Sequence, residues 1–295
     1  MQIPVKHQTR EWSGLVYVLP ALIFIFIFNF WPIIWGIVLG FMDFRGVTLT
    51  GKWVGLANFR ELISDDRVAQ GLVISAKYVL YTYPVTQILA LATGWLIAEL
   101  KSPKAARIYR VLLYLPVIIP LSAGMTMFKA LYEQNGYLNA FLGKFGIEPI
   151  PWLTSPEVAM FALAIAVIWR NFGASMFYYL IGFYNISREV KESALIDGAD
   201  TLRRFWYVDL PSIKNMLFLI FVQSAGVLAG GLAEVTALTG GGPARATSIL
   251  PYYATEVSIW GEQRLGYAAA INLTLSLFTL AIATIVMRTM KLDRD

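Results

Sequence analysis

The chain has 295 residues, of which 57% are hydrophobic and 15% charged, with a mean hydropathy of +0.60 and a formal net charge of +5. Its apolar runs are far longer than a soluble core helix needs, which indicates a polytopic membrane protein. Cysteine is absent and His7 is the sole histidine, so the composition excludes disulfides, thiolate nucleophiles and His/Cys metal sites.

Six segments reach the length of about 20 mostly apolar residues that a bilayer requires. They lie at residues 15–42, 72–98, 108–128, 158–184, 215–235 and 265–287. The first has no charged residue from Trp12 to Met42, which is too long for the core of a signal peptide, so we expect it to remain as a span. The sequence therefore predicts an all-α protein in which residues 1–295 form a single transmembrane domain with six helices.

The basic residues predict the orientation of these spans. Fourteen Lys and Arg residues lie at the termini and in the loops on the same side, against eight in the alternate loops at about 43–71, 129–157 and 239–264. The positive-inside rule places both termini in the cytoplasm of a cell with a plasma (inner) membrane. The same bias accounts for the sequence pI of 9.3 as attraction to anionic lipid, and no nucleic-acid partner is predicted.

The loop after the fourth predicted span, residues 187–211, is too polar to cross a membrane. Ser187 can cap a short helix that ends at Gly198, and Asp200 or Thr201 can cap a second one. We expect Pro211 to end the second helix and begin the fifth span.

Two interpretations of this loop stay open from the residues alone. It can lie on the inner leaflet, with Arg203 and Arg204 at headgroups and Trp206 at the interface. Alternatively it can dock on a partner protein, because two short helices cannot bury their apolar residues by themselves.

Four motifs add a resemblance to a known family. Glu192-Ser193-Ala194, Gly198, Val208 and Leu210-Pro211 match the spacing of the EAA loop of binding-protein-dependent ABC importer permeases, with Ser193 for Ala and Val208 for Ile as the departures. The segments Trp53–Phe59 (WVGLANF), Leu238–Pro243 (LTGGGP) and Leu265–Ile271 (LGYAAAI) resemble motifs of the carbohydrate branch. The chain is thus similar to MalF-like permease subunits.

The resemblance implies that the helix after Ser187 is a coupling helix that contacts a cytoplasmic ATPase. The implied coupling residues are Glu192, Ser193, Ala194, Leu195, Asp197, Gly198 and Ala199. Implied partners are a second, MalG-like permease, an ATP-binding cassette ATPase dimer, an extracytoplasmic solute-binding protein, a sugar and membrane lipid. The phosphate-binding pattern GxxxxGK[ST] is absent, so ATP and Mg would be bound by the ATPase, and this chain is expected to have neither a cofactor nor a catalytic residue.

Arg170 lies near the middle of the fourth predicted span, where a charge facing lipid is costly. It is either a structural cation, paired with Glu234 or with backbone carbonyls, or a cavity residue near the substrate. In the fifth predicted span, Gly226 and Gly230 have GxxxG spacing, which serves helix packing or leaves room for a sugar.

Carried over residue by residue, the resemblance also implies a substrate path and a docking loop. The path residues are Trp169, Arg170, Asn171, Ala174, Ser224, Val227, Leu228, Gly231 and Glu234. The loop that would contact the binding protein is Gly240, Gly241, Gly242 and Pro243, although glycine turns alone also explain it. Val227, Leu228 and Gly231 offer no ring or amide to a sugar, which would assign most substrate contacts to the partner permease.

Other function classes fit the sequence less well. An intramembrane enzyme would need a nucleophile or metal set, and the sequence has neither HExxH nor GxSxG. A secondary transporter would need intramembrane acidic groups, and only Glu234 is available. The sequence predicts an ATP-driven sugar importer, with glycerol phosphate or an acidic oligosaccharide as the alternative substrate because of Arg170.

Overall fold

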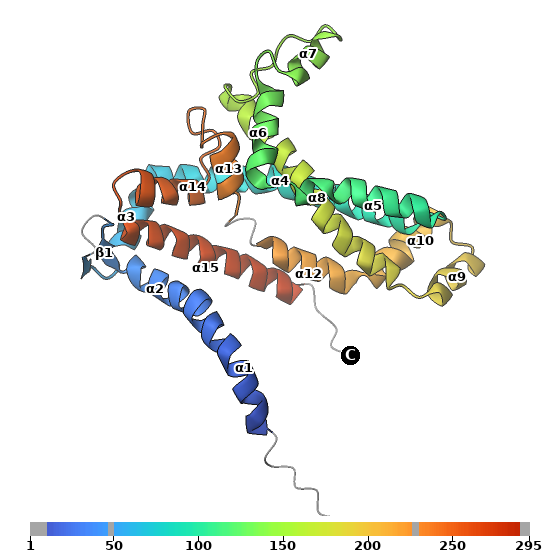
Figure 1. Ribbon diagram of the computed structural model, residues 1–295, viewed down its shortest axis with the longest axis horizontal. Helices are drawn as coiled ribbons and strands as arrows, with labels where there is room; N and C mark the ends of the chain where they lie inside the picture. The colour runs from blue at the N-terminus through green and yellow to red at the C-terminus, as the bar shows by residue number, and fades with distance from the viewer. Residues whose placement is uncertain (1–10, 47–49, 226–229, 290–295) are drawn as a thin grey trace, which may run out of the picture. The chain divides into compact units, whose positions relative to one another are not determined.

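The computed structural model describes residues 11–46, 50–225 and 230–289. The contacts of the chain divide it into two units, Met1–Ser64 with Ala254–Leu273 and Asp65–Tyr253 with Thr274–Asp295. Figure 1 shows the elements of both units, each of which is described by itself below. The single domain predicted for residues 1–295 stays a prediction.

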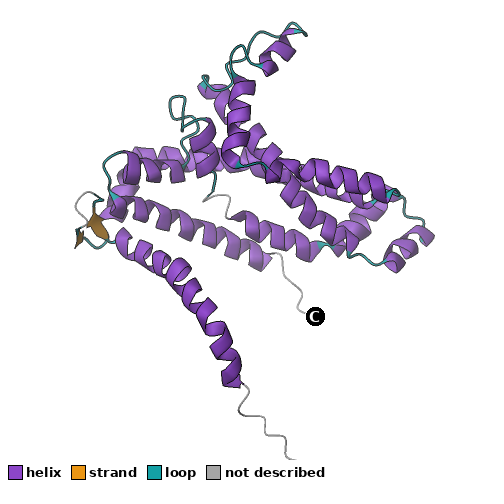
Figure 2. Cartoon of the chain, viewed as in Figure 1, coloured by secondary structure: helices purple, strands orange, loops and turns teal. Residues whose placement is uncertain are grey.

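Unit 1 combines a long apolar helix with a small hairpin. Its elements are α1 (Glu11–Ile25), the π-helical turn η1 (Phe26–Phe30), α2 (Trp31–Gly40), β1 (Met42–Phe44), β2 (Gly51–Trp53), α3 (Ala57–Ser64), η3 (Glu256–Trp260) and the first part of α15 (Leu265–Thr289). The strands pair antiparallel with Met42 opposite Trp53, and they are drawn in orange in Figure 2.

Residues from two of the sequence motifs make close contacts within unit 1. Asn58 of WVGLANF is buried, and its Nδ2 donates to the carbonyls of Gly40 at 3.0 Å and Met42 at 2.9 Å. A Cβ on Gly266 of LGYAAAI would lie 1.9 Å from the Met42 carbonyl, so only glycine fits there. These contacts fix the end of the first span against the start of α15.

Unit 2 contains most of the helices. In chain order these are α4 (Asp66–Ala98), α5 (Pro103–Ile118), α6 (Leu121–Tyr132), α7 (Tyr137–Gly143), α8 (Pro156–Tyr184), α9 (Arg188–Ile196), α10 (Thr201–Arg204), η2 (Phe205–Asp209), α11 (Leu210–Ser212), α12 (Lys214–Ala225) and α13 (Leu232–Leu238). α14 (Leu250–Thr255) begins in unit 2, and α15 belongs to it from Thr274 onward.

Local sequence signals start several of these helices. Asp65, Ser102, Ser155 and Ser187 cap α4, α5, α8 and α9, each accepting a hydrogen bond from a backbone N–H of the first turn. Proline follows Ser102 and Ser155 at the first helical position, where its missing N–H costs nothing. The chain thus begins its helices where the sequence supplies caps.

Helices α4 and α8 form the centre of unit 2. Glycine lets backbones approach closely here: a Cβ on Gly94 of α4 would lie 3.1 Å from the Met176 carbonyl of α8. At Gly173 of α8, a Cβ would lie 2.3 Å from the Leu113 carbonyl of α5. One buried cluster around Met125 and Leu163 and a second around Leu180 and Phe183 pack along this helix pair.

Among the described residues, three helical segments are long and apolar enough to cross a membrane: Tyr17–Gly40, Pro156–Tyr184 and Leu265–Ile285. A fourth is added if Pro103–Ile118 and Leu121–Gly143, bent by 94°, count as one span. Helix α4 has 33 residues, long enough to cross, but its polar residues lower its hydropathy. The mostly helical membrane architecture is confirmed, and the number of six spans stays a prediction.

Three boundary predictions need correction. Residues 215–235 do not form one continuous helix, because α12 ends at Ala225 and Gly231, in the left-handed conformation, precedes α13. Residues 108–128 do not form one continuous helix, because the chain is extended at Ile119 and Pro120 and turns sharply there. Pro211 does not end a helix, because the π-helical turn η2 precedes it and helix continues to Ser212. The wider turn separates the proline ring from the carbonyl with which it would otherwise clash.

Candidate functional site

A cavity of about 510 Å³ lies in unit 2 among α4, α8 and the start of α13. Its lining consists of Tyr78, Thr82, Tyr83, Thr86, Gln87, Val167, Asn171, Ala174, Ser175, Tyr178, Gly230, Gly231 and Glu234. Most of these side chains carry a hydroxyl, amide or carboxylate group. The cavity therefore has polar groups on its walls, on helices that also carry apolar residues.

The polar wall on α4 was missed by sequence reasoning, which placed no site residue on the second span. Tyr78, Thr82 and Thr86 recur every fourth residue and are buried on one face. The hydroxyl of Thr82 donates to the Tyr78 carbonyl and that of Thr86 to the Thr82 carbonyl, both at 2.7 Å. The repeat of hydroxyl residues at helical spacing inside an apolar segment was the available signal.

Gln87 connects α4 to α8 across the cavity edge. Its Oε1 accepts a hydrogen bond from the Tyr179 hydroxyl at 2.8 Å, and its Nε2 lies 3.5 Å from the Ser175 Oγ. These contacts fix the amide, since both of its ends have partners on the same helix. Gln87 therefore presents a positioned polar group at the cavity wall.

The predicted path residues separate into two groups. Asn171, Ala174, Gly231 and Glu234 line the cavity. Trp169 lies elsewhere, packed edge-to-face on Phe128 with 5.3 Å between ring centroids. Ser224 lies in the last turn of α12, whereas Gly226, Val227 and Leu228 lie outside the described residues. Contact of any of these residues with a substrate stays a prediction.

Arg170 does not line this cavity. Its Nη1 lies 3.5 Å from the Asn171 Oδ1, and its buried Nε has no hydrogen-bond partner within the described part of the chain. The alternative pairing of Arg170 with Glu234 is also not found among the described residues, where no ion pair joins the two. Arg170 thus sits beside the cavity wall and contacts it through Asn171.

Gly231 shapes the cavity by letting two segments meet. It has a φ of +84°, a conformation that side-chain-bearing residues rarely adopt, and it begins α13. A Cβ at this position would lie 2.8 Å from the ring of Tyr78. The glycine therefore brings Glu234, in the first turn of α13, to the polar wall of α4.

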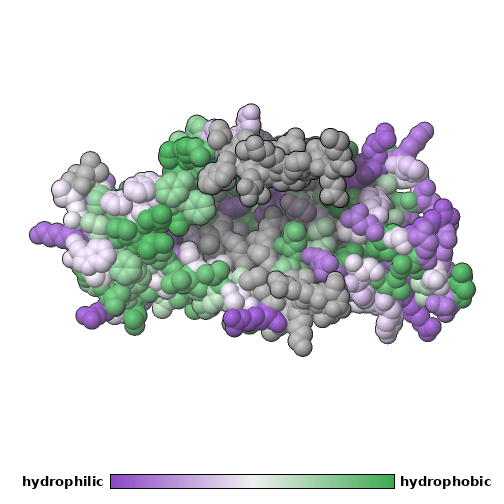
Figure 3. Space-filling view, turned by 90° about the horizontal axis from the view of Figure 1, so that it is seen from below, coloured by the Kyte–Doolittle hydropathy of each residue, from purple (hydrophilic) through white to green (hydrophobic). Residues whose placement is uncertain are grey.

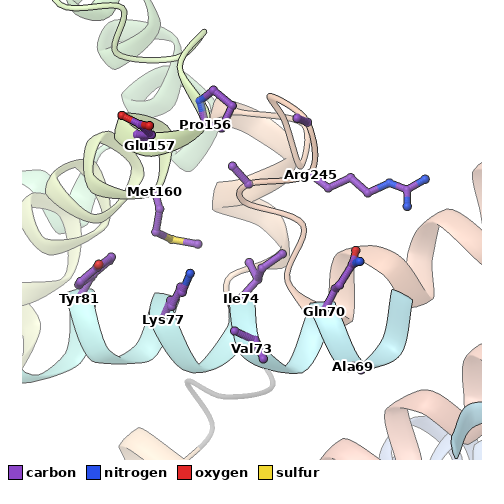
Figure 4. Close-up of a pocket in the computed structure, with 12 residues that line it drawn as sticks. Ala69, Gln70, Val73, Ile74, Lys77, Tyr81, Pro156, Glu157, Met160 and Arg245 are labelled. Atoms are coloured by element: carbon purple, nitrogen blue, oxygen red, sulfur yellow. The ribbon is translucent and has the colours of Figure 1, made fainter. Parts of the chain in front are cut away.

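A second cavity of about 700 Å³ lies nearer the start of α4 and α8 (Figure 4). Lys77 points from α4 toward Met160 in this view, whereas Arg245 extends along the rim near Gln70. Glu157 lies at the opposite edge, so the lining carries both signs of charge. This second cavity has no counterpart in the sequence predictions.

The predicted coupling segment folds as two capped helices joined at glycine, as the residues indicated. The Ser187 hydroxyl caps α9, the Asp200 carboxylate caps α10, and Gly198 between them has a φ of +80°. Glu192, Ser193, Leu195 and Asp197 are exposed, Ala199 is half-buried and Ala194 is buried. Figure 3 shows hydrophilic residues gathered at the end where Figure 1 labels α9 and α10.

A buried charge cluster attaches this segment to the last turn of α4. Glu99 pairs with Lys191 of α9 at 3.3 Å and with Arg204 of α10. Arg204 also contacts Asp209 at 3.2 Å, and the Trp95 Nε1 donates to the same Asp209 oxygen at 3.0 Å. Arg204 is therefore buried at an internal cluster, which corrects the alternative in which it lies on lipid headgroups.

The cluster controls the ionisation of its members. Burial opposes the charge of Glu99, but the hydrogen bond and charge of Arg204, together with Lys191, hold the pKa of Glu99 below its ordinary value of 4.5. Burial likewise lowers the pKa of Arg204, and Glu99 with Asp209 outweighs this effect and raises it. Glu99 and Arg204 are therefore both charged at neutral pH.

The glycine loop after α13 is held by side chains of its own unit. Gly240 and Gly241 have φ of +59° and +76°. The Tyr252 hydroxyl donates to the Gly240 carbonyl at 2.7 Å, and the Thr247 hydroxyl to the Gly242 carbonyl at 2.8 Å. The loop is thus a fixed turn, and its contact with a binding protein stays a prediction.

Comparison with known proteins bears on these features directly. The family model described as "Binding-protein-dependent transport system inner membrane component" matches residues 90–292, which include the cavity's α8 wall and the whole coupling segment. The chain belongs to this family. It is a multi-pass permease component of an ABC importer, a subunit type that is not itself catalytic. The predicted resemblance to importer permeases is thereby confirmed.

Individual relatives cover nearly the whole chain. The lactose transport system permease protein LacF of Rhizobium radiobacter is 30% identical over 277 residues, 92% of this chain and 91% of that protein. The sn-glycerol-3-phosphate transport system permease protein UgpA of Agrobacterium fabrum is 28% identical, with 92% of each covered.

A bacterial ABC transporter involved in import of the acidic polysaccharide alginate has a chain of the same fold. The TM-score is 0.82 at 22% identity, with 97% of both chains covered. A structure of the alginate transporter in complex with a pentasaccharide-bound periplasmic protein gives a TM-score of 0.81. The permease fold of this chain is thus confirmed by structures as well as by sequence.

Proposed function

We propose that this permease subunit moves a sugar, in particular an oligosaccharide, from an extracytoplasmic binding protein to the cytoplasm by alternating access driven by a partner ATPase. The observation that carries the proposal is the combination, in one unit, of a polar cavity of about 510 Å³ with an exposed, capped helix α9 tied to the same helix α4. The cavity can bind a polar solute, and the exposed surface of α9 can contact the ATPase.

The orientation and the partners follow from this arrangement. The α9 end of unit 2 faces the cytoplasm, in agreement with the excess of basic residues in the loops on that side. There α9 contacts the ATPase through Glu192 and its neighbours, while the Gly240–Pro243 loop faces the binding protein. A second permease completes the path, because the polar wall of α4 and α8 encloses the solute on one side.

The transport cycle uses these contacts in order. A loaded binding protein docks outside, ATP closes the ATPase dimer, and α9 passes that closure to the helices so that the cavity opens outward. Hydrolysis then returns the cavity to its inward-open state. ATP and Mg bind the ATPase only, and no cofactor binds this chain.

A neutral sugar fits the chemistry of the cavity. Volumes of about 300–1,000 Å³ are typical of small-molecule sites. The hydroxyls of Thr82 and Thr86 are already bonded to their own helix, whereas the groups of Asn171 and Glu234 face the cavity. The amide of Asn171 can donate to and accept from sugar hydroxyls, and a carboxylate accepts hydrogen bonds from them. Similarity to the lactose permease LacF supports the same substrate class.

An acidic oligosaccharide or glycerol phosphate is the second candidate. It is favoured by Lys77 and Arg245 at the second cavity and by similarity to UgpA. Arg170 supports it less than the sequence indicated, because the arginine lies outside the cavity lining.

Substitution of Gly198 tests the proposal. A side chain there meets open space but is forced into a φ of +80°, so Gly198→Val should distort the joint between α9 and α10 without a clash. Gly146→Val is the matched control, because Gly146 has a φ of +77°, also lies in open space and belongs to the loop after α7. A thermal-shift screen of the binding protein identifies the sugar for the uptake assay.

We expect the purified complex to contain an ATPase and to take up sugar only with ATP. Gly198→Val should abolish uptake at normal membrane abundance, while Gly146→Val transports normally. Uptake without ATP, or normal uptake by Gly198→Val, would show that the function has been assigned wrongly.

A further inference from the structure

Apolar packing holds helix α9 only weakly. Of its nine residues, all of them described, Ala194 alone is buried. Residues Asn185–Ser187 connect it to α8 without helical structure, and Gly198, with a φ of +80°, connects it to α10. Hydrophobic stabilisation scales with the apolar area buried, so the orientation of α9 has to depend on other contacts.

Charged side chains supply these contacts at the last turn of α4. The Lys191 Nζ of α9 lies 3.3 Å from the Glu99 Oε1, with about a quarter of each side chain exposed (23% and 26%). Glu99 is also the C-terminal cap residue of α4. The same carboxylate pairs with Arg204, which Asp209 holds in place. Glu99 therefore joins both helices of the 187–211 segment to α4.

Helix α4 can carry a displacement from Glu99 to the cavity. Thr86 and Gln87 line the cavity, and the stretch from Gln87 to Ala98 is helical and contains no proline. At 1.5 Å rise per residue, Gln87 lies ~18 Å along the axis from Glu99, about three turns. A helix of this length moves as a stiff element, because each turn is hydrogen-bonded to the next.

We propose that Glu99 and Lys191 are positioning residues that make α4, with its cavity wall, move together with α9. In their absence, α9 is held to the spans by its two non-helical joints and by the small apolar contact of Ala194. This inference rests on the proposed function, in which the ATPase moves α9. It assigns the coupling to a specific ion pair in addition to continuity of the chain.

The distance between α9 and α4 measures this coupling without knowledge of the sugar. The chain has no cysteine, so Glu189→Cys on α9 and Ile88→Cys on α4, both at exposed positions, introduce two unique sites for nitroxide labels. Double electron–electron resonance is recorded on the full complex in lipid vesicles, with and without ATP. We expect one distance that is unchanged by ATP.

Lys191→Met should then let the distance shift when ATP is added, and Lys191→Arg should restore the fixed distance because it keeps the charge. Lys101→Met is the matched control: Lys101 is exposed, two residues beyond Glu99, and in no ion pair within the described residues. In a Glu99→Gln background, Lys191→Met should add no further shift.

Each outcome decides the inference. An ATP-dependent shift in the unmodified chain, or a Lys191→Met variant that behaves like Lys101→Met, would overturn it while leaving the ATP-driven import proposal standing. Failure of the import proposal is recognised separately, because then no ATPase copurifies and ATP changes no label distance in any variant.

Discussion

Two arginine clusters, one in each unit, show how differently similar ion pairs can stabilise one chain. Arg264 of unit 1 makes a bidentate pair with Glu61, at 2.6 and 2.5 Å, in which 22% and 44% of the side chains are exposed. Arg204 of unit 2 pairs with Asp209, and only 8% and 0% of those side chains are exposed. Arg264 thereby joins residues that are distant in sequence, and Arg204 does so through its second partner, Glu99.

The difference lies in what remains when one partner is lost. Water can solvate Glu61 in place of Arg264, so we expect the more exposed pair to contribute less to stability than the buried pair. Asp209 cannot reach water, and the loss of Arg204 would leave a buried charge with the Trp95 hydrogen bond alone. Loss of one partner from the buried cluster should therefore strongly destabilise the fold, whereas loss of one partner from the exposed pair should have only a small effect.

Arg204→Leu should have the largest effect. We expect a loss of about 3–5 kcal/mol in the free energy of unfolding, because Asp209 is left unpaired in the interior. The measurement is thermal unfolding of the purified protein in detergent. Arg203→Leu, one residue earlier and exposed, should change stability by less than about 0.5 kcal/mol. Equal effects of the two substitutions would contradict the distinction between buried and exposed charge.

Glu99→Gln should have an intermediate effect that depends on pH. Because the pKa of Glu99 is lowered in the folded protein, its ionised form stabilises the fold fully above the unfolded value of 4.5. This stabilisation disappears as the pH falls through the lowered pKa. The unfolding temperatures of Glu99→Gln and the unmodified chain should thus differ at pH 7 and converge in acid.

Glu148→Gln, at an exposed position, provides the reference for the pH series. A difference between Glu99→Gln and the unmodified chain that grows in acid would show that Glu99 is protonated in the cluster.

Arg264→Gln should have the smallest effect, below about 1 kcal/mol. The Glu61 hydrogen bond raises the pKa of Arg264, so the arginine stays charged, and salt weakens the pair by screening. The difference in unfolding temperature between this variant and the unmodified chain should shrink as the salt concentration rises. Arg60→Gln serves as the exposed control. A loss of unfolding free energy as large as that expected for Arg204→Leu would contradict the proposed difference between the two clusters.

The sequence predicted features that depend on near neighbours. The caps Ser187 and Asp200 and the turn at Gly198 were foreseen, because each acts within a few residues. Membership of the importer permeases was also predicted from motif spacing. The role of Asn58 inside its motif required the fold, since its partners lie on the other side of a hairpin.

Features that depend on distant pairs could not be predicted. No local pattern in the sequence points to the role of Glu99, because its partners Lys191 and Arg204 are far along the chain. Trp169 and Asn171 are two residues apart, yet one packs in the core and the other lines the cavity, since helical rotation separates them. Only the position of neighbouring helices decides which of them faces the polar space.

The 94° bend between α5 and α6 has a consequence for what surrounds unit 2. The last four carbonyls of α5 lack partners within their helix, as at every helix end, and Ile118 beside them is exposed. Unbonded peptide groups are not tolerated against acyl chains. We therefore expect that corner of the molecule to lie away from acyl chains, where water or protein can bond these carbonyls.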